Sequence, residues 1–272
     1  MKFPVYSERP ANTESVIPPL REIFRGTAVT VCEFTSADLR QGILREPDTV
    51  GFSLPGIIGE VSSYTDQIGE TGLQEMSAAI HAGRVMLAIC AGAYFPHRQT
   101  IYDPSWGQRR SRTPINHLIK GLAQGPVADM GGQYDPSLWP SDLSLCDVWH
   151  KTAGSTALNS TWHRTSVAYG NGPAFYPDNP DDPDLEPLAF YASVPGKPLA
   201  AASLQHGAGK ILMLGVLPHI GYRDIPQMEG FAKVRQLMED LKGHESGRQN
   251  FQRLIGERLR IQINTYLTLK NQ

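Results

Sequence analysis

The stretch VMLAICAGAY, residues 85–94, carries the strongest structural signal in the chain. Its first five residues are apolar without alternation, which is typical of a central parallel strand covered on both faces. Cys90 follows at once, and small residues occupy the positions where a helix would begin. A strand that runs into a nucleophilic residue and then into a helix has the layout of a nucleophile elbow. We therefore expect Cys90 at the tip of a sharp turn between a buried strand and a helix.

The small residues around Cys90 have a physical purpose in such a turn. The backbone at the nucleophile is strained, and a side chain at Gly92 would collide with the strand or helix packed beside it. The helix amino terminus favours the Cys90 thiolate, and the Ala91 amide can donate a hydrogen bond to a developing oxyanion. The alternative is a buried core cysteine, which is the commonest fate of an intracellular Cys.

A second apolar run, residues 50–54, ends at Pro55-Gly56 and predicts a strand followed by a tight turn. Residues 72–83 then have the apolar spacing of a helix. Strand, helix and strand in this order predict a right-handed crossover in a parallel sheet. Because the carboxyl ends of parallel strands border one crevice, the amide of Gly56 or Ile57 could supply a second oxyanion donor.

The rest of the chain divides by composition. The first 25 residues hold four prolines and predict an irregular arm. Residues 95–160 predict long loops with short elements, and residues 178–187 predict a solvated acidic loop. Two strands, 198–204 and 210–216, are joined by a glycine-rich turn. We therefore expect an arm over residues 1–25, an α/β domain over 26–224, and a helical extension over 225–272 packed on that domain.

Composition limits the function classes. The 272 residues are 40% hydrophobic and 19% charged, as in globular proteins. A net charge of −2 argues against a surface built mainly to bind nucleic acid or a membrane. Neither a membrane-spanning run nor a signal peptide is expected, and three cysteines at unrelated spacings exclude a disulfide framework and a CxxC zinc site. These features predict a soluble, cytoplasmic protein that needs no cofactor and no metal.

Two motifs, GFSLPG at residues 51–56 and AICAGAYF at 88–95, resemble the class I glutamine amidotransferase-like superfamily. Within it they are most similar to the amino-terminal domain of eukaryotic-type biotin-protein ligases and its free-standing bacterial relatives. Further matches are GLAQGPV at residues 121–127, YGNGPAF at 169–175, and the closing strand pair that ends at His219.

This resemblance spans roughly residues 25 to 222 and implies a flavodoxin-like three-layer α/β/α sandwich with a mainly parallel central sheet. The ligase's catalytic domain is not included, so biotin transfer is not implied. The resemblance also implies a site of Cys, His and an acid, in which Cys90 matches the nucleophile and His219 the general base. The residues expected to line the pocket are Tyr64, Gly92, Tyr94 and Asn171.

The sequence also departs from the family pattern. Active amidotransferases follow the histidine with Pro-Glu, whereas an Ile-Gly pair follows His219 here. Asp224 and Glu60 could orient the imidazole from nearby segments, although neither matches the family's position. Ile57 stands where many relatives have a second glycine, and a β-branched residue does not readily adopt positive φ. Because losing the orienting carboxylate of a catalytic triad lowers turnover by about 10⁴, these departures argue against glutaminase activity.

Other candidate residues are weaker. His97 follows the elbow and is a second candidate base, while Cys32 is expected in the core. Residues 109–112 hold three arginines that could receive an anionic group, Arg109, Arg110 and Arg112, although a solvated loop is favoured. Three residues with metal-like spacing are favoured as loop residues because further ligands are not evident: Cys146, His150 and His163.

Two functions remain open at this point. In the first, Cys90 attacks an amide or related carbon–nitrogen bond of a small-molecule substrate through a thioester, and a separate acceptor enzyme would be needed for ammonia transfer. In the second, the same fold is a catalytically degenerate binding or regulatory module, which the missing acid favours. A redox or glyoxalase-type activity is disfavoured because no His follows Cys90 directly. The oligomeric state is not specified by the sequence.

Overall fold

The computed structural model describes residues 1–57, 62–103, 109–113, 117–127, 143–154, 161–224 and 232–270. The strands are β1 (Lys2–Tyr6), β2 (Thr30–Phe34), β3 (Gly51–Leu54), β4 (Val85–Ile89), β5 (His97–Tyr102), β6 (Arg110–Arg112), β7 (Ile119–Gly125), β8 (Ser144–Lys151), β9 (Trp162–Tyr169), β10 (Ala174–Pro177), β11 (Leu185–Tyr191), β12 (Leu199–His206) and β13 (Gly209–Leu214). The helices are α1 (Thr13–Ile23), α2 (Ser36–Gln41), the 3₁₀ turn η1 (Ile43–Arg45), α3 (Ser62–Gln67), α4 (Gly69–His81), α5 (Ala91–Tyr94), α6 (Ala232–Gly243) and α7 (Glu245–Lys270).

The described strands form one sheet in the order β2-β1-β3-β4-β13-β12-β10-β7-β5-β6, with β11, β8 and β9 continuing from β12. From β2 to β13 every neighbouring pair is parallel, as the order of strand, helix and strand predicts. Strand β12 turns back on β13 as an antiparallel hairpin closed at His206 and Gly209, which the glycine-rich turn also predicts. The chain is therefore an α/β protein of the flavodoxin-like type, with an antiparallel extension beyond its parallel centre.

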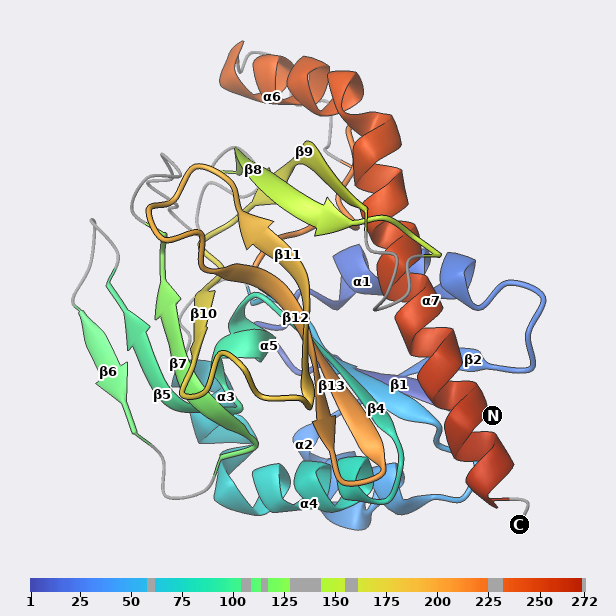
Figure 1. Ribbon diagram of the computed structural model, residues 1–272. Helices are drawn as coiled ribbons and strands as arrows, with labels where there is room; N and C mark the ends of the chain where they lie inside the picture. The colour runs from blue at the N-terminus through green and yellow to red at the C-terminus, as the bar shows by residue number, and fades with distance from the viewer. Residues whose placement is uncertain are drawn as a thin grey trace.

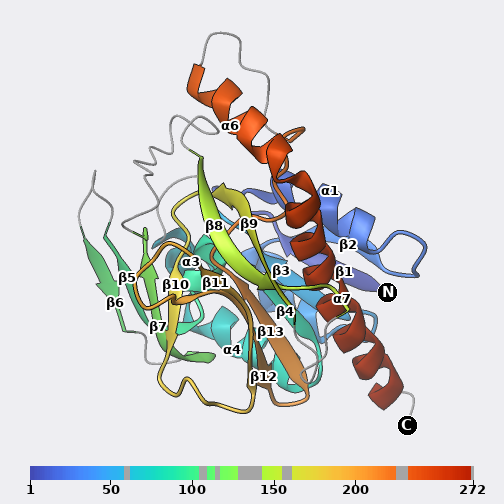
Figure 2. The ribbon, with the colours of Figure 1, turned by 45° about the horizontal axis from the view of Figure 1, so that its top comes forward.

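Helices cover both faces of the parallel centre. Figures 1 and 2 show α1 and α7 on one side of the sheet, with α2 and α4 on the other. In β4 the side chains alternate between these two layers: Leu87 and Ile89 join the core under α1 and α7, and Met86 and Ala88 join the core over α4. Every residue of β4 is buried. The prediction of a central strand covered on both faces is confirmed.

The predicted irregular arm at residues 1–25 is wrong. Strand β1 lies between β2 and β3 in the parallel sheet, and Phe3 and Val5 are fully buried. Helix α1 forms although Pro18 and Pro19 lie inside it. Each proline removes one helical hydrogen bond, but the helix buries an apolar stripe of Val16, Ile17 and Leu20 against the sheet. Tertiary packing thus outweighs the local signal of the prolines.

The described part of residues 95–160 also differs from the prediction of long loops. It contains β5 to β8, and β5 pairs in parallel with β7 inside the sheet. In β7 the buried and exposed residues alternate through Ile119-Lys120-Gly121, as on a strand with one covered face. The sequence does not show this two-residue alternation clearly, because many residues of these strands are small or polar and not apolar.

Helix α7 continues the core beyond the sheet. It lies within the helical extension predicted over residues 225–272, and its buried stripe includes Phe251, Leu254 and Leu259. These side chains belong to the same core as those of α1 and β4. None of the described helices is long and apolar enough to cross a membrane.

Truncation of one α7 core residue should destabilise the whole fold. We expect Leu254→Ala, at a fully buried position, to lower the free energy of unfolding by about 2 to 5 kcal/mol, because it leaves a cavity in the core. Leu269→Ala on the same helix removes the same atoms from a side chain that is 51% exposed, and should change stability by less than about 0.5 kcal/mol. Urea unfolding followed by circular dichroism measures both. Equal effects would mean that α7 is not part of the cooperative core.

Candidate functional site

The residues of the predicted elbow form a strained turn at the carboxyl end of β4. Cys90 lies between β4 and α5 with φ 51° and ψ −112°, in a region that non-glycine residues rarely adopt. Its backbone N–H donates to the Leu214 carbonyl of β13 at 2.8 Å. Its own carbonyl accepts from the N–H groups of Ala93 and Tyr94 at 2.9 and 3.2 Å. Hydrogen bonds on both sides therefore hold the strained conformation in place.

Two glycines allow the turn to approach β3. A Cβ atom at Gly92 would overlap the Leu54 carbonyl, which bears out the expectation that a side chain there would collide with the neighbouring strand. A Cβ at Gly56 would lie 3.4 Å from the Cys90 Cβ and 3.9 Å from its Sγ, so the Gly56 main chain borders the sulfur directly. The Gly56 carbonyl accepts from the Asn12 N–H at 2.8 Å, and in the planar peptide the Ile57 N–H points the opposite way. Gly56, Ile57 and Ala91 as oxyanion donors remain a prediction.

The Cys90 thiol is protonated in this environment. It is 8% exposed and donates to the Gly170 carbonyl at 3.4 Å. Burial raises its pKa to about 12, against a smaller lowering by the Ala91 amide. The expected stabilisation of a thiolate by the helix terminus is therefore too small to matter, because α5 is only four residues long and burial dominates.

Buried tyrosines fix the segment that lies against the thiol. The hydroxyls of Tyr94, Tyr169 and Tyr191 donate to the carbonyls of Asn171, Gly172 and Pro173 at 3.0, 2.9 and 2.9 Å. We call residues 170–173 with these three hydroxyls the tyrosine clamp.

Tyr64 of α3 donates to the Pro55 carbonyl, next to Gly56, at 2.7 Å. Asn171, the only asparagine among the residues expected to line the pocket, is buried at φ 64°. Three of the four expected lining residues, Tyr64, Tyr94 and Asn171, thus lie around the elbow, and Gly92 lies within it. The contribution of Tyr191 was missed, because nothing in its local sequence distinguishes it from a core residue of β11.

His219 lies beyond β13 in a different setting. It borders a cavity of about 30 Å³ with residues of α1, α7 and β4, among them Leu20, Ile255 and Ile89. Its Nδ1 atom is buried without a hydrogen-bond partner, and the described contacts include no hydrogen bond from this ring to Cys90. Burial, together with the smaller effect of the Arg248 charge, lowers the pKa of His219 to about 4. The ring is neutral at pH 7.

The charged side chain beside His219 is a cation, Arg248, and not the carboxylate that would orient the imidazole. Arg248 of α7 donates to the Pro218 carbonyl at 2.7 Å and forms an ion pair with Glu245. Asp224 accepts from the Gly221 N–H at 2.7 Å and so serves its own turn. Glu60, the other predicted acid, lies outside the described residues. A cation next to the imidazole disfavours the protonated form that a general base must reach.

The remaining candidates serve other contacts. His97 is buried and bonds the Ala93 carbonyl through Nδ1 at 2.7 Å, and the described contacts give it no hydrogen bond to Cys90. Cys32 is in β2 as expected but only partly buried, because β2 is an edge strand. Arg112 lies over the Phe95 ring and Arg109 pairs with Asp103, while Arg110 is in β6.

The three residues with metal-like spacing are in strands, not in the predicted loops. Cys146 and His150 lie in β8, and His163 faces His150 from β9. His150 stacks on Phe251 at 5.0 Å, and burial raises the pKa of the Cys146 thiol. Within the described residues no cluster of three or more His, Cys, Asp or Glu side chains could hold a metal ion.

A methyl group at Gly92 should test the close packing of the elbow. We expect Gly92→Ala to lower the free energy of unfolding by more than about 2 kcal/mol, because the new Cβ meets backbone that cannot move aside cheaply. Gly243→Ala is the matched control, since nothing lies within 4 Å of a Cβ there. Thermal or urea unfolding compares them. A stable Gly92→Ala protein would contradict the packing described here.

The buried histidines should make stability fall in acid. His219, with its pKa near 4 in the folded chain, takes up a proton near pH 6.5 once unfolded. The unfolded state therefore binds more protons between pH 6.5 and 4, and stability decreases as pH falls through this window. His219→Gln should flatten that decrease, and His163→Gln, at an exposed position, should not. Urea unfolding at pH 4.5, 5.5 and 7 measures the slopes, and identical slopes for all three proteins would contradict the burial of the His219 ring.

Comparison with known proteins agrees with this architecture. The family described as "Biotin-protein ligase, N terminal" matches residues 6–272. An uncharacterized protein of Chlamydia muridarum (strain MoPn / Nigg) is 24% identical over 234 residues, which is 84% of this chain and 82% of that protein.

Similar solved structures include a putative GMP synthase subunit from Thermoplasma acidophilum, with 13% identity, 93% and 97% of the two chains covered, and a TM-score of 0.45. Another is a putative ThuA-like protein from Bacteroides uniformis ATCC 8492, with 10% identity, 88% of each chain covered, and a TM-score of 0.46. The family match extends over nearly the whole sequence, elbow included. The chain therefore belongs to the family of biotin-protein ligase N-terminal domains.

Proposed function

We propose that this protein is a catalytically degenerate member of its fold that binds a small molecule at the elbow without forming a thioester. The observation that carries the proposal is the state of the thiol: Cys90 is protonated, buried and hydrogen-bonded to the Gly170 carbonyl. Nucleophilic catalysis requires a thiolate, or a base that takes the proton as the thiol attacks.

The pKa values of Cys90 and His219 favour ligand binding over catalytic turnover. A thiol with a pKa of about 12 is ionised in only about one molecule in 10⁵ at pH 7. His219 is neutral, but the Arg248 cation opposes its protonation and no described carboxylate orients its ring. Both missing steps, ionisation of the nucleophile and stabilisation of the imidazolium, are needed in the same reaction.

A second candidate is an amidohydrolase, which the strained backbone of Cys90 favours. Strain at a residue flanked by a close glycine is typical of sites that position a nucleophile. In this alternative the Cys90 sulfur attacks an amide carbon, the carbon–nitrogen bond breaks, and His219 passes the thiol proton to the leaving amine. Water then hydrolyses the thioester, with the amides of Gly56, Ile57 and Ala91 as oxyanion donors.

The proposal also includes the binding partners of the protein and its cellular compartment. The ligand would be a small molecule, and a separate acceptor enzyme is required only by the amidohydrolase alternative. All three cysteines are free thiols, which supports a reducing compartment such as the cytoplasm. The balanced charge supports a protein that binds neither nucleic acid nor membrane.

The pH dependence of thiol labelling separates the two candidates. We expect iodoacetamide, followed by peptide mass spectrometry on the native protein, to modify Cys90 with a rate that still rises at pH 10, because its pKa lies near 12. Partly exposed Cys32 is an internal control for reagent access. A plateau of the Cys90 rate below about pH 8.5 would show a poised thiolate and overturn the binding proposal. Ammonia released from glutamine by the unmodified protein but not by Cys90→Ser would do the same.

A further inference from the structure

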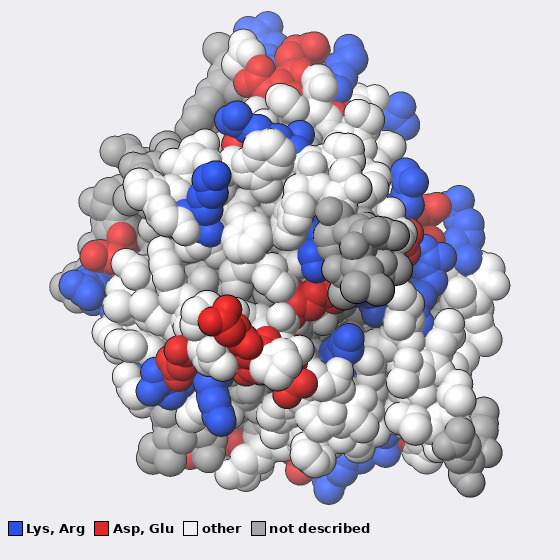
Figure 3. All heavy atoms as spheres, viewed as in Figure 1, with Lys and Arg blue, Asp and Glu red and all other residues white. Residues whose placement is uncertain are grey.

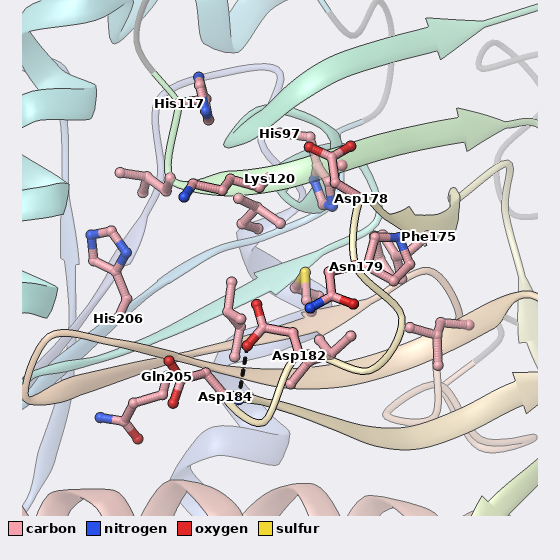
Figure 4. Close-up of a pocket in the computed structure, with 18 of the residues that line it drawn as sticks. His97, His117, Lys120, Phe175, Asp178, Asn179, Asp182, Asp184, Gln205 and His206 are labelled. Carbon is pink, nitrogen blue, oxygen red and sulfur yellow. Dashed lines mark hydrogen bonds between the residues drawn. The ribbon is translucent and has the colours of Figure 1, made fainter.

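A second cavity, of about 410 Å³, is lined by described residues that do not include Cys90. It opens on the α4 side of the sheet, between β7, β10 and the hairpin of β12 and β13 (Figure 4). Its lining extends along this hairpin from His206 to Met213, which pairs with Ala88 near the end of β4. Its volume is in the usual range for a small-molecule site.

The inner wall of this cavity is apolar. Phe175, Leu199 and Met213 line it and are each at most 6% exposed as residues. Leu118 and Ile119 add the wall on the β7 side. Such a surface favours a flat or branched apolar body over a sugar or a phosphate.

Histidine side chains are among the polar groups that line the cavity, and one of them is almost fully buried. His97 lines the cavity, is 1% exposed, and stacks on Phe175 with ring centroids 5.2 Å apart and planes 7° from parallel. Its Nδ1 lies 2.7 Å from the Ala93 carbonyl, which only accepts, so Nδ1 carries the proton. Burial lowers the pKa of this ring to about 4 and keeps it neutral. Nε2 is therefore an acceptor, and it can receive an N–H or O–H donor of a ligand.

The mouth of the cavity carries both signs of charge. Figure 4 shows Lys120 extending from β7 on one side of the opening, and Asp182 and Asp184 on the segment between β10 and β11 on the other. Figure 3 shows acidic side chains gathered where this segment reaches the surface. Asp178 is already paired with Arg98 at 2.6 Å. Lys120 has no ion pair among the described residues, and Asp182 accepts a hydrogen bond from the Asp184 N–H at 3.0 Å, so both charges can also meet a ligand that carries an anion and a cation.

We propose that this cavity binds a zwitterionic α-amino acid whose aromatic side chain carries a hydrogen-bond donor, as in tryptophan or tyrosine. The ring lies against Phe175, Leu199 and Met213, and its N–H or O–H donates to His97 Nε2. The carboxylate is received by Lys120, and the ammonium group by Asp182 and Asp184. Cys90 does not line this site, so the proposal does not depend on the function proposed for Cys90.

A series of related ligands tests the three contacts without changing the protein. Isothermal titration calorimetry should detect binding of L-tryptophan. Three analogues should each bind at least about tenfold more weakly, because each leaves one partner unpaired. Benzothienylalanine replaces the ring N–H by sulfur, tryptamine lacks the carboxylate, and indole-3-propionate lacks the ammonium group. Absence of binding by both tryptophan and tyrosine, or an analogue that binds as tightly as tryptophan, would overturn the proposal.

Two variants at the mouth assign the charges. Lys120→Met should weaken tryptophan binding about tenfold and leave tryptamine binding unchanged, because tryptamine has no carboxylate to lose. Asp182→Asn should weaken tryptophan binding and leave indole-3-propionate unchanged, while its amide oxygen can still accept from the Asp184 N–H. Lys242→Met, on exposed α6, is the matched control and should have no effect. If Lys120→Met weakened tryptamine binding as much as tryptophan binding, the effect would be nonspecific. The same holds if Asp182→Asn weakened indole-3-propionate binding as much as tryptophan binding, and either result would contradict the charge assignment.

Discussion

The close approach of the elbow to strand β3 is the constraint on which the rest of the site depends. Gly92 has no room for a side chain because the Leu54 carbonyl occupies that space, and the Cys90 N–H is held by Leu214 on the other side. Between these two strands the backbone must turn sharply, and the positive φ of Cys90 is the result. The sulfur then lies against the main chain of Gly56 and donates to the carbonyl of Gly170.

Much of the central fold follows from local sequence. The unbroken apolar run of residues 85–89 identifies a strand between two helical layers, and the small residues after Cys90 identify the turn. The first 25 residues mislead, because proline is a strong local signal while the burial of Phe3 and Leu20 depends on parts of the chain far away in sequence. Strands β5 and β7 were missed for a related reason, since long polar residues in β5 and glycines in β7 hide the hydrophobic period of each strand.

The chemistry of the site is less visible in sequence than its geometry. A helix start after Cys90 argues for a low pKa, but the degree of burial decides the sign, and burial is a property of the assembled fold. Arg248 is 29 positions after His219 and reaches it only because α7 packs back along the sheet. The sequence shows directly that no Glu follows His219. It does not show that a cation from another helix, Arg248, lies beside the imidazole instead.

The tyrosine clamp has a consequence for how any molecule could be recognised near Cys90. Each of three consecutive carbonyls, those of Asn171, Gly172 and Pro173, already receives a phenolic proton. This main-chain segment can change its conformation little when a ligand binds, because moving it would break three hydrogen bonds at once. Ligand selectivity on this side of the thiol must therefore come from a rigid, preformed surface. Ligands would bind there by shape complementarity and not by adaptation of the backbone.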